Sequence, residues 1–193
     1  MRRGLVLLVA GATIAGACAG GSRQGLLDGF EGTISQETVD YGSGNGSAVS
    51  VSAVQDTVHS GKQALKVEYT TISSGYMWVA RGYGLDVKGA AQWSMEPEAI
   101  DWSAWNGLSF WVNGAGDGTM IAFDVKDAGG EMWRAVFTID EPGWQQVKAP
   151  FEHLFARTDW QPDTARVDDV LDFPLKSYQF EVRTPGQGVF YVD

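Results

Sequence analysis

The sequence predicts an all-β domain, a two-layer antiparallel β-sandwich with jelly-roll connectivity. Short runs of alternating apolar and polar residues recur along the chain, and this is the period of strands with one face in a core. The 25 glycines and six prolines fall mainly between these runs, as turn residues do. Helical periodicity is nearly absent. With 193 residues, 44% of them hydrophobic, the chain can form one domain with a sizeable core.

The N-terminal segment is expected to lie outside this domain. Two arginines precede an apolar, uncharged run that extends to Gly16, which is the composition of a secretory leader, and the run is shorter than the about 20 residues of a membrane span. Residues 1–17 are therefore expected to be a signal peptide. Cys18 resembles the lipidated cysteine of bacterial lipoproteins, with residues 18–25 as lipid anchor and tether. The alternative is a small residue in a leader that is cleaved nearby.

The charge of the chain argues against a nucleic-acid partner, and its cysteine content excludes an internal disulfide. The formal net charge is −10, and removal of the two leader arginines would leave 12 basic residues against 24 acidic ones. No basic patch is available to displace counterions from phosphates, so nucleic acid is not an expected partner. The single cysteine excludes a disulfide within the chain. We expect a monomer in the bacterial cell envelope that meets a membrane only through Cys18.

The domain is expected to span residues 26–193, and its first half to contain three extended segments. It begins with the phrase LLDGFEG, and a stretch rich in Gly, Ser and Asn predicts a loop or irregular edge at residues 38–47. Alternating or aromatic-rich runs place the extended segments near residues 49–52, 65–70 and 75–83. Residues 84–100 then form a connection that is long for a compact sandwich. Such loops are often functional.

The second half contains the most regular alternation in the chain. Residues 101–114 read DWSAWNGLSFWVNG, in which Leu108, Phe110 and Val112 share one face and predict a central strand with that face in the core. Residues 153–171 are expected to be irregular. Further strands are expected near residues 120–126, 132–139, 144–151, 178–182 and 189–192.

The tryptophans are expected to differ in their exposure. Trp160 stands in a polar setting, followed by Gln161 and Pro162, so it is a candidate for an exposed role. Trp93, in the long loop, is a second candidate for the rim of a cleft. The other tryptophans are expected to pack in the sandwich: Trp78, Trp102, Trp105, Trp111, Trp133 and Trp144.

The chain from about Leu26 to Asp193 resembles family 11 carbohydrate-binding modules, which have a galactose-binding-like jelly roll. The matching phrases are LLDGFEG, SGKQALKVEY, SGYMWVARGY, DWSAWNGLSFWVNG, WQQVKAPF, FARTDWQPD and FYVD. The resemblance implies binding of β-1,4 and mixed-linkage β-glucans in a cleft, in proteins that usually carry a glycoside hydrolase. Where the family has an aromatic residue in an early loop, this chain has residues 42–44, which lack one.

Carried over by matching phrases, the resemblance implies a glycan site made by Tyr76, Arg157, Asp159 and Trp160. A pyranose ring has apolar faces and hydroxyl edges, so aromatic platforms beside charged hydrogen-bond partners suit it. Tyr76 and Trp160 would be the platforms, with Trp93 at the rim. Arg157 and Asp159 would pair and offer spare donors and acceptors to hydroxyls. Two or three platforms imply dissociation constants of about 10⁻⁵ to 10⁻³ M.

Calcium is the expected cofactor. Glu31 and Asp193 are hard oxygen ligands that suit calcium, joined by backbone carbonyls of the turn around Ser60 and Lys62. The resemblance implies that an ion at this place ties the first and last strands together. The alternative is that both carboxylates are solvated.

The sequence therefore predicts a non-catalytic carbohydrate-binding domain of a secreted lipoprotein. For catalysis, Glu96, Glu98 and Asp101 are close in sequence, but Pro97 places them in a loop rather than on one strand across a cleft. Two alternatives remain. One is a structural or assembly lipoprotein, related to complex I intermediate-associated proteins, that binds another protein. The other is an accessory fragment of a glycoside hydrolase whose catalytic domain follows Asp193.

Overall fold

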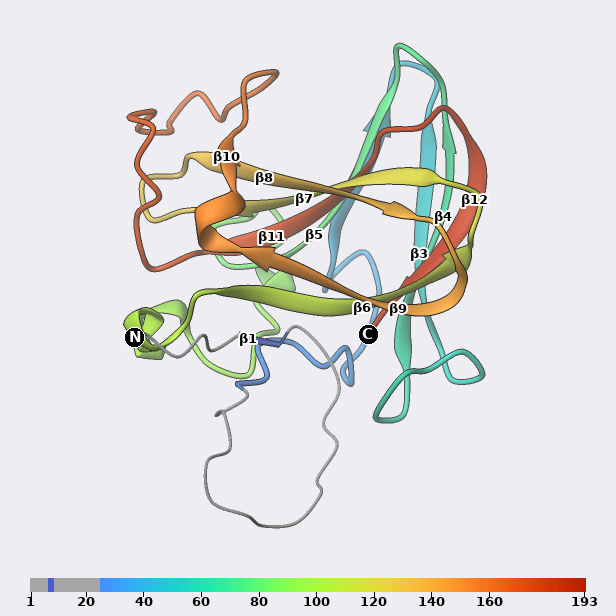
Figure 1. The fold of residues 1–193 in the computed structure, drawn as a ribbon, viewed down its shortest axis with the longest axis horizontal. Helices are drawn as coiled ribbons and strands as arrows, with labels where there is room; N and C mark the ends of the chain where they lie inside the picture. Colours follow the sequence, from blue (N-terminus) through green and yellow to red (C-terminus); the bar gives the residue numbers. More distant parts are fainter. Residues whose placement is uncertain (1–6, 9–24) are drawn as a thin grey trace.

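Two β-sheets form the layers of a sandwich in a computed structural model of the chain, as predicted (Figure 1). The structure describes residues 7–8 and 25–193. Cys18 and most of the expected signal peptide therefore lie outside the described residues. The exception is residues 7–8, strand β1, which pairs in parallel with strand β6. The strands of the first sheet are β9 (Pro142–Pro150), β6 (Gly107–Ala115), β1 (Leu7–Leu8), β12 (Gly186–Val192), β4 (Ala64–Thr71) and β3 (Ala48–Val54).

The outer face of the second sheet carries the candidate functional site described below. All of its strand pairs are antiparallel. In order across the sheet, its strands are β10 (Phe155–Ala156), β8 (Met132–Ile139), β7 (Thr119–Lys126), β11 (Ser177–Val182), β5 (Tyr76–Gly82) and β2 (Asp40–Gly44). Short 3₁₀ turns interrupt the connections: η1 (Lys88–Ala90), η2 (Pro97–Ala99), η3 (Trp102–Ala104) and η4 (Phe151–His153). Among the described residues, no helix has the length and apolar composition needed to cross a membrane.

The core lies between the inner faces of the two sheets and is rich in aromatic residues. Leu108, Phe110 and Val112 of β6 are at most 2% exposed, which confirms the alternation predicted for this strand. The ring of Phe110 lies 4.7 Å from that of Phe123 in β7 and 5.1 Å from that of Phe180 in β11. One strand of the first sheet thus contacts two strands of the second through aromatic pairs.

The start of the domain is held by a buried ion pair. The carboxylate of Asp28 is 1% exposed and accepts hydrogen bonds from the Arg81 guanidinium at 3.0 Å and from the Tyr178 hydroxyl at 2.8 Å. Arg81 belongs to β5 and Tyr178 to β11. The segment before β2 is therefore attached to the inner face of the second sheet, where Leu27 and Phe30 join the core.

The outer face of the first sheet carries tryptophans that were expected to be packed. Trp111 of β6 and Trp144 of β9 are half-buried there, and the His59 ring stacks on Trp111 at 3.8 Å. Trp102 and Trp133 are buried as predicted, at 7% and 8% exposure. The prediction that these side chains pack in the sandwich is thus confirmed for Trp102 and Trp133. The two tryptophans on the outer face are more exposed than predicted.

Candidate functional site

A cleft of about 1090 Å³ lies over the outer face of the second sheet. Strands β5 and β11 supply much of its lining, and the β10–β11 connection, the orange loop at the upper left of Figure 1, adds Arg157, Asp159 and Trp160. The turn before β5 and the residues that follow β11 also line it. Three of the predicted ligand-binding residues from one loop therefore share a cleft with Tyr76, the fourth.

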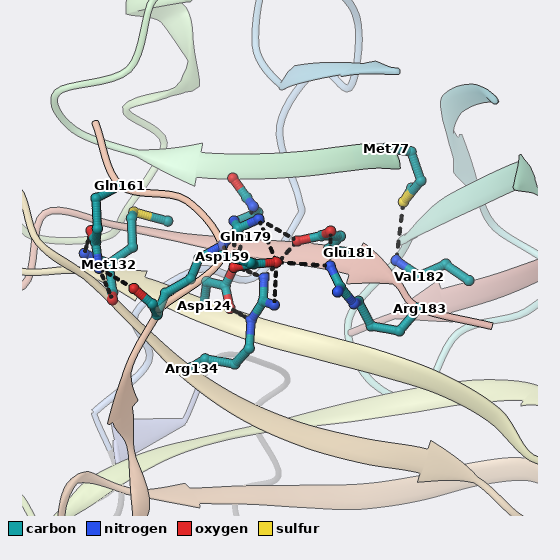
Figure 2. Close-up of polar contacts among 11 residues, drawn as sticks. Met77, Asp124, Met132, Arg134, Asp159, Gln161, Gln179, Glu181, Val182 and Arg183 are labelled. Atoms are coloured by element: carbon teal, nitrogen blue, oxygen red, sulfur yellow. Dashed lines mark hydrogen bonds and ion pairs between the residues drawn. The ribbon is translucent and has the colours of Figure 1, made fainter. Parts of the chain in front are cut away.

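The register of the sheet places polar side chains in one row on this face. Arg134 of β8 is the cross-strand partner of Asp124 in β7, and Asp124 is the partner of Gln179 in β11. Cross-strand partners point to the same side of a sheet, so these three side chains meet. Arg134 donates to both oxygens of Asp124 at 2.6 and 2.9 Å and to Glu181 of β11 at 2.6 Å (Figure 2).

The β10–β11 loop closes this row into a network of three arginines and three carboxylates. Arg157 donates to Asp159 at 2.6 Å and to Asp124 at 3.1 Å. Asp159 also accepts from Arg134 and from Arg183, each at 3.3 Å. Formal charge is balanced within the network, and every carboxylate in it is bound by at least two arginines.

The arginines determine the ionisation of Asp159. Partial burial of this carboxylate opposes ionisation, but the hydrogen bond from Arg157 and the charges of Arg157, Arg134 and Arg183 outweigh it. Together they lower the pKa of Asp159 to about 2. Asp159 is therefore a fixed negative charge and hydrogen-bond acceptor at the edge of the cleft, with 41% of its side chain exposed.

Trp160 is exposed, as predicted, and more so than any Phe, Tyr or other Trp among the described residues. Its exposure is 53%, and the Arg157 guanidinium lies over its ring at 5.3 Å from the centroid. This cation–π contact holds one ring face against the network and leaves the side chain accessible from the cleft.

Tyr76 and Trp78 lie together on β5, with their ring centroids 6.1 Å apart and their planes inclined by 19°. Tyr76 is 47% exposed, and both residues line the cleft. The structure corrects the expectation that Trp78 packs in the core: Met77 and Val79 point inward, so Trp78, on the alternate face, points outward.

Trp93 does not line the cleft, and its predicted position at the rim is wrong. Its side chain is 7% exposed, stacked on Tyr178 at 6.2 Å and in edge contact with Tyr83 at 5.9 Å. The long loop folds back over the core, where the amide of Ser94 donates to the carbonyl of Leu27 at 2.7 Å. Its first residues, 84–86, do line the cleft.

The four predicted calcium ligands converge away from the cleft, at the turn between β3 and β4. Glu31 accepts a hydrogen bond from the amide of Lys62 at 2.7 Å, and Asp193 accepts from the amides of His59 and Ser60, each at 2.7 Å. The turn thus faces the carboxylates with its N–H groups and with the Ser60 hydroxyl, which donates to Asp193 at 3.3 Å. That the carbonyls of this turn bind calcium stays a prediction.

The donor set at this turn suits a hard cation but is small. Asp193 is fully buried, and burial raises its pKa against the opposing hydrogen bonds from the turn. Within residues 25–193, neither Glu31 nor Asp193 forms an ion pair with a basic side chain. Within the same residues, no cluster of three or more Asp, Glu, His or Cys side chains could hold a metal. Carbonyl or water oxygens would have to complete a calcium shell.

Comparison with known proteins decides the family. The sequence profile of carbohydrate-binding domains of family 11 matches residues 14–193. The chain belongs to this family. A family 11 module from Clostridium thermocellum, solved in complex with a β-1,3-1,4-mixed-linked tetrasaccharide, is 26% identical, with a TM-score of 0.67 over 86% of this chain and 90% of that one. The solution structure of a protein named CtCBM11 is 25% identical, with a TM-score of 0.66 over 86% of this chain and 90% of that one.

A curated relative of this family 11 domain is an enzyme. A mannan endo-1,4-β-mannosidase from Bifidobacterium adolescentis is 23% identical over 145 residues, which are 75% of this chain. The chain spans 13% of the length of that enzyme. The similarity therefore concerns one part of a much longer protein.

The sequence did not reveal four residues at the family 11 cleft: Trp78 and Glu181, which line it, and Asp124 and Arg134, which form the ion pairs that reach Glu181. A weak signal was present, because the three charged residues each stand between two apolar neighbours within a strand. That pattern places them on the outer face of the sheet. Their proximity depends on strand register, which the sequence does not specify.

Proposed function

We propose that this family 11 domain binds a β-glucan chain in the cleft and does not cleave it. The observation that carries the proposal is the combination of an exposed Trp160, held by Arg157, with a fixed network of charged hydrogen-bonding groups. The ligand of the solved relative, a mixed-linked β-glucan tetrasaccharide, supports this ligand class.

Each part of the cleft suits a different part of a sugar. The aromatic rings of Tyr76 and Trp160 offer apolar surface to the C–H faces of a pyranose, and burial of this surface favours binding. Asp159 and Arg183 are 41% and 37% exposed, so their free lone pairs and N–H groups are accessible to hydroxyls. Because the network is charge-balanced, a neutral glycan suits it better than an anionic one.

The state of the carboxylates supports binding rather than hydrolysis. A glycosidase needs one carboxyl that holds a proton near neutral pH and a second that acts as nucleophile or base. Asp124, Asp159 and Glu181 are each bound by arginines, and the pKa of Asp159 is about 2. Burial raises the pKa of Asp124, but Asp124 and Glu181 are buried against the arginines, so none of the three is placed to serve as a general acid.

A β-mannan is a second candidate ligand, favoured by the similarity to a mannan endo-1,4-β-mannosidase. The mannan that this relative is named for and cellulose-type glucans both have β-1,4-linked backbones, and their sugar units differ in the configuration of one hydroxyl group. The binding experiment below therefore includes oligosaccharides of both kinds.

We further propose the cellular setting and the cofactor. The domain is carried as a monomer on the bacterial cell envelope by a lipid on Cys18, which cell fractionation with a Cys18→Ala variant tests. A structural calcium binds between Glu31, Asp193 and the turn at Ser60 and Lys62, because both carboxylates accept hydrogen bonds from this one turn. Neither feature takes part in glycan recognition.

Calorimetry with the purified domain tests the binding function. We expect mixed-linkage β-glucan oligosaccharides to bind with a dissociation constant of about 10⁻⁵ to 10⁻³ M. Trp160→Ala should weaken binding about tenfold and leave the melting temperature nearly unchanged, because the ring is an exposed platform. Trp111→Ala, on the outer face of the other sheet, is the matched control and should bind as the natural protein does.

Two outcomes would contradict the proposal. One is the absence of heat with mixed-linkage glucan, cellulose-type and mannan oligosaccharides at protein concentrations near a millimolar. The other is release of reducing sugar that disappears in a carboxylate variant of the cleft, since this would make the domain an enzyme.

A further inference from the structure

The geometry points to Trp78 as a specificity-determining residue that, together with Tyr76, makes one continuous two-ring floor for two consecutive coplanar sugar rings. This inference rests on the proposed glycan-binding function. It adds a residue that the resemblance to the family does not assign, and it assigns a role to two glycines of the neighbouring edge strand.

The two rings lie side by side on one strand. Tyr76 and Trp78 are two positions apart in β5, so both project from the outer face of the sheet. Their centroids are 6.1 Å apart and their planes are within 19° of parallel. That spacing is close to the length of one sugar unit, so each ring can serve one unit of a chain that runs along β5.

Both rings lie flat because the neighbouring strand has no side chains beneath them. Gly44 and Gly42 of β2 are the cross-strand partners of Tyr76 and Trp78. A Cβ on Gly44 would stand 2.5 Å from both Cζ and Oη of Tyr76 and 2.7 Å from Cε1. A Cβ on Gly42 would stand 2.5, 2.7 and 3.1 Å from Cη2, Cζ2 and Cζ3 of Trp78.

These distances show which side of each ring meets the backbone. An atom approaching the edge of a ring is much nearer to one ring atom than to the next, whereas an atom above the face is nearly equidistant from several. The distances at Gly42 and Gly44 are of the second kind. Each ring therefore lies face down on a glycine, with its other face turned away from the sheet, and any larger residue in β2 would lift it.

The orientation of Trp78 is also fixed from its polar edge. Its indole N–H donates a hydrogen bond to Asp40 in β2 at 3.1 Å. Asp40 in turn accepts from the amide of Asp86 at 3.1 Å, in the loop that borders the cleft. The floor is thus in place before a ligand arrives.

A flat two-ring floor selects for linkage. In β-1,4-linked glucans and mannans both bonds to each ring are equatorial and point in opposite directions, so consecutive rings form a flat ribbon and two can stack at once. A β-1,3 link turns the next ring out of that plane, so only one ring can stack. Trp78 therefore adds affinity for a β-1,4-linked pair and little for a β-1,3-linked one.

The experiment compares two probes, a β-1,4-linked and a β-1,3-linked glucotetraose, by calorimetry. We expect Trp78→Ala to weaken binding of the β-1,4 tetraose about tenfold and binding of the β-1,3 tetraose less than about twofold. Gly42→Ala should act in the same direction by lifting the Trp78 ring. Its backbone conformation is open to alanine, so it serves as the test if Trp78→Ala folds poorly. Trp111→Ala should change neither affinity.

The outcomes separate the inference from the function on which it rests. If the natural protein binds neither tetraose nor any mixed-linkage glucan, the proposed function fails and the inference with it. If the natural protein binds but the Trp78 and Gly42 variants keep their affinity for the β-1,4 tetraose, or lose both probes equally, the inference alone is overturned.

Discussion

Asp159 shows how neighbouring arginines fix the charge of one partly exposed residue. Its pKa of about 2 lies below the usual value of about 3.9, so the folded protein holds this carboxylate ionised where the unfolded chain begins to take up protons. Ionised Asp159 therefore stabilises the fold above about pH 4, and this contribution is lost as the pH falls toward 2.

This sign leads to a prediction about pH. The natural protein should have a higher free energy of unfolding than Asp159→Asn near neutral pH, and the difference should shrink between about pH 4 and pH 2. Denaturant unfolding at several pH values measures it. Asp56→Asn, an exposed carboxylate change away from the network, is the control. A difference that stays constant throughout this range would contradict the assigned pKa.

Single residues also show what sequence reasoning can and cannot find. Trp160 was predicted to be exposed because its neighbours are polar, and the structure agrees. Trp93 was predicted at the rim because it stands in the long loop, but that loop folds back and buries it. Trp78 was missed because apolar residues surround it in sequence, although the alternation of β5 places it on the outer face. Local polarity is thus a weaker guide than strand alternation.

At the scale of elements, the segment that begins the domain depends on one buried ion pair. Asp28 bridges this segment to Arg81 of β5 and Tyr178 of β11. Asp28→Asn would leave the Arg81 charge buried without its partner, which we expect to lower the free energy of unfolding by about 3–5 kcal/mol. Chemical denaturation measures the loss.

The control for this prediction is again Asp56→Asn, which makes the same carboxylate-to-amide change at an exposed position. Glycan affinity is a second readout, because Asp28 lies on the inner side of the sheet and Tyr76 and Trp160 on the outer side. Loss of binding in folded Asp28→Asn protein, or a change in stability no larger than that of the control, would contradict the assigned role.

Elements with regular alternation were predictable and those without it were not. The core face of β6 was assigned from sequence and is confirmed, because burial of one face imposes a period of two on the residues. The charged network was not predicted, because Asp124, Arg134 and Glu181 come from three strands. Their contacts follow from register and from a loop without periodicity, and neither leaves a local pattern in the chain.

At the scale of the whole molecule, the turn between β3 and β4 joins the beginning and the end of the domain. Glu31 and Asp193 are far apart in sequence, and both bind this turn. A calcium ion held there would stabilise the folded state by mass action, by about 2.7 kcal/mol at about a hundredfold excess over its dissociation constant.

We therefore expect the melting temperature to be higher in calcium than in a chelator. Asp193→Asn should remove this dependence, and magnesium should not replace calcium, because it prefers smaller, more regular oxygen shells. Scanning calorimetry provides the measurement. Equal melting temperatures in calcium and chelator would contradict the proposed site while leaving the cleft unaffected.

The fold class and the family followed from the sequence because many short phrases agree along the whole domain. The details of the cleft did not, because they depend on how the two layers and their loops meet in space. Four of the five residues predicted to bind the ligand do line one cleft, although their contact with a glycan is still a prediction.

The balanced network of arginines and carboxylates affects the entropy cost of glycan binding. Its side chains already hold one another in place, so little rotational freedom remains to be lost when a sugar arrives. The cost of ordering these groups falls on folding rather than on recognition. Because a glucan or mannan chain carries no charge, the field of the protein does not steer it, and association should proceed at the same rate in dilute and concentrated salt.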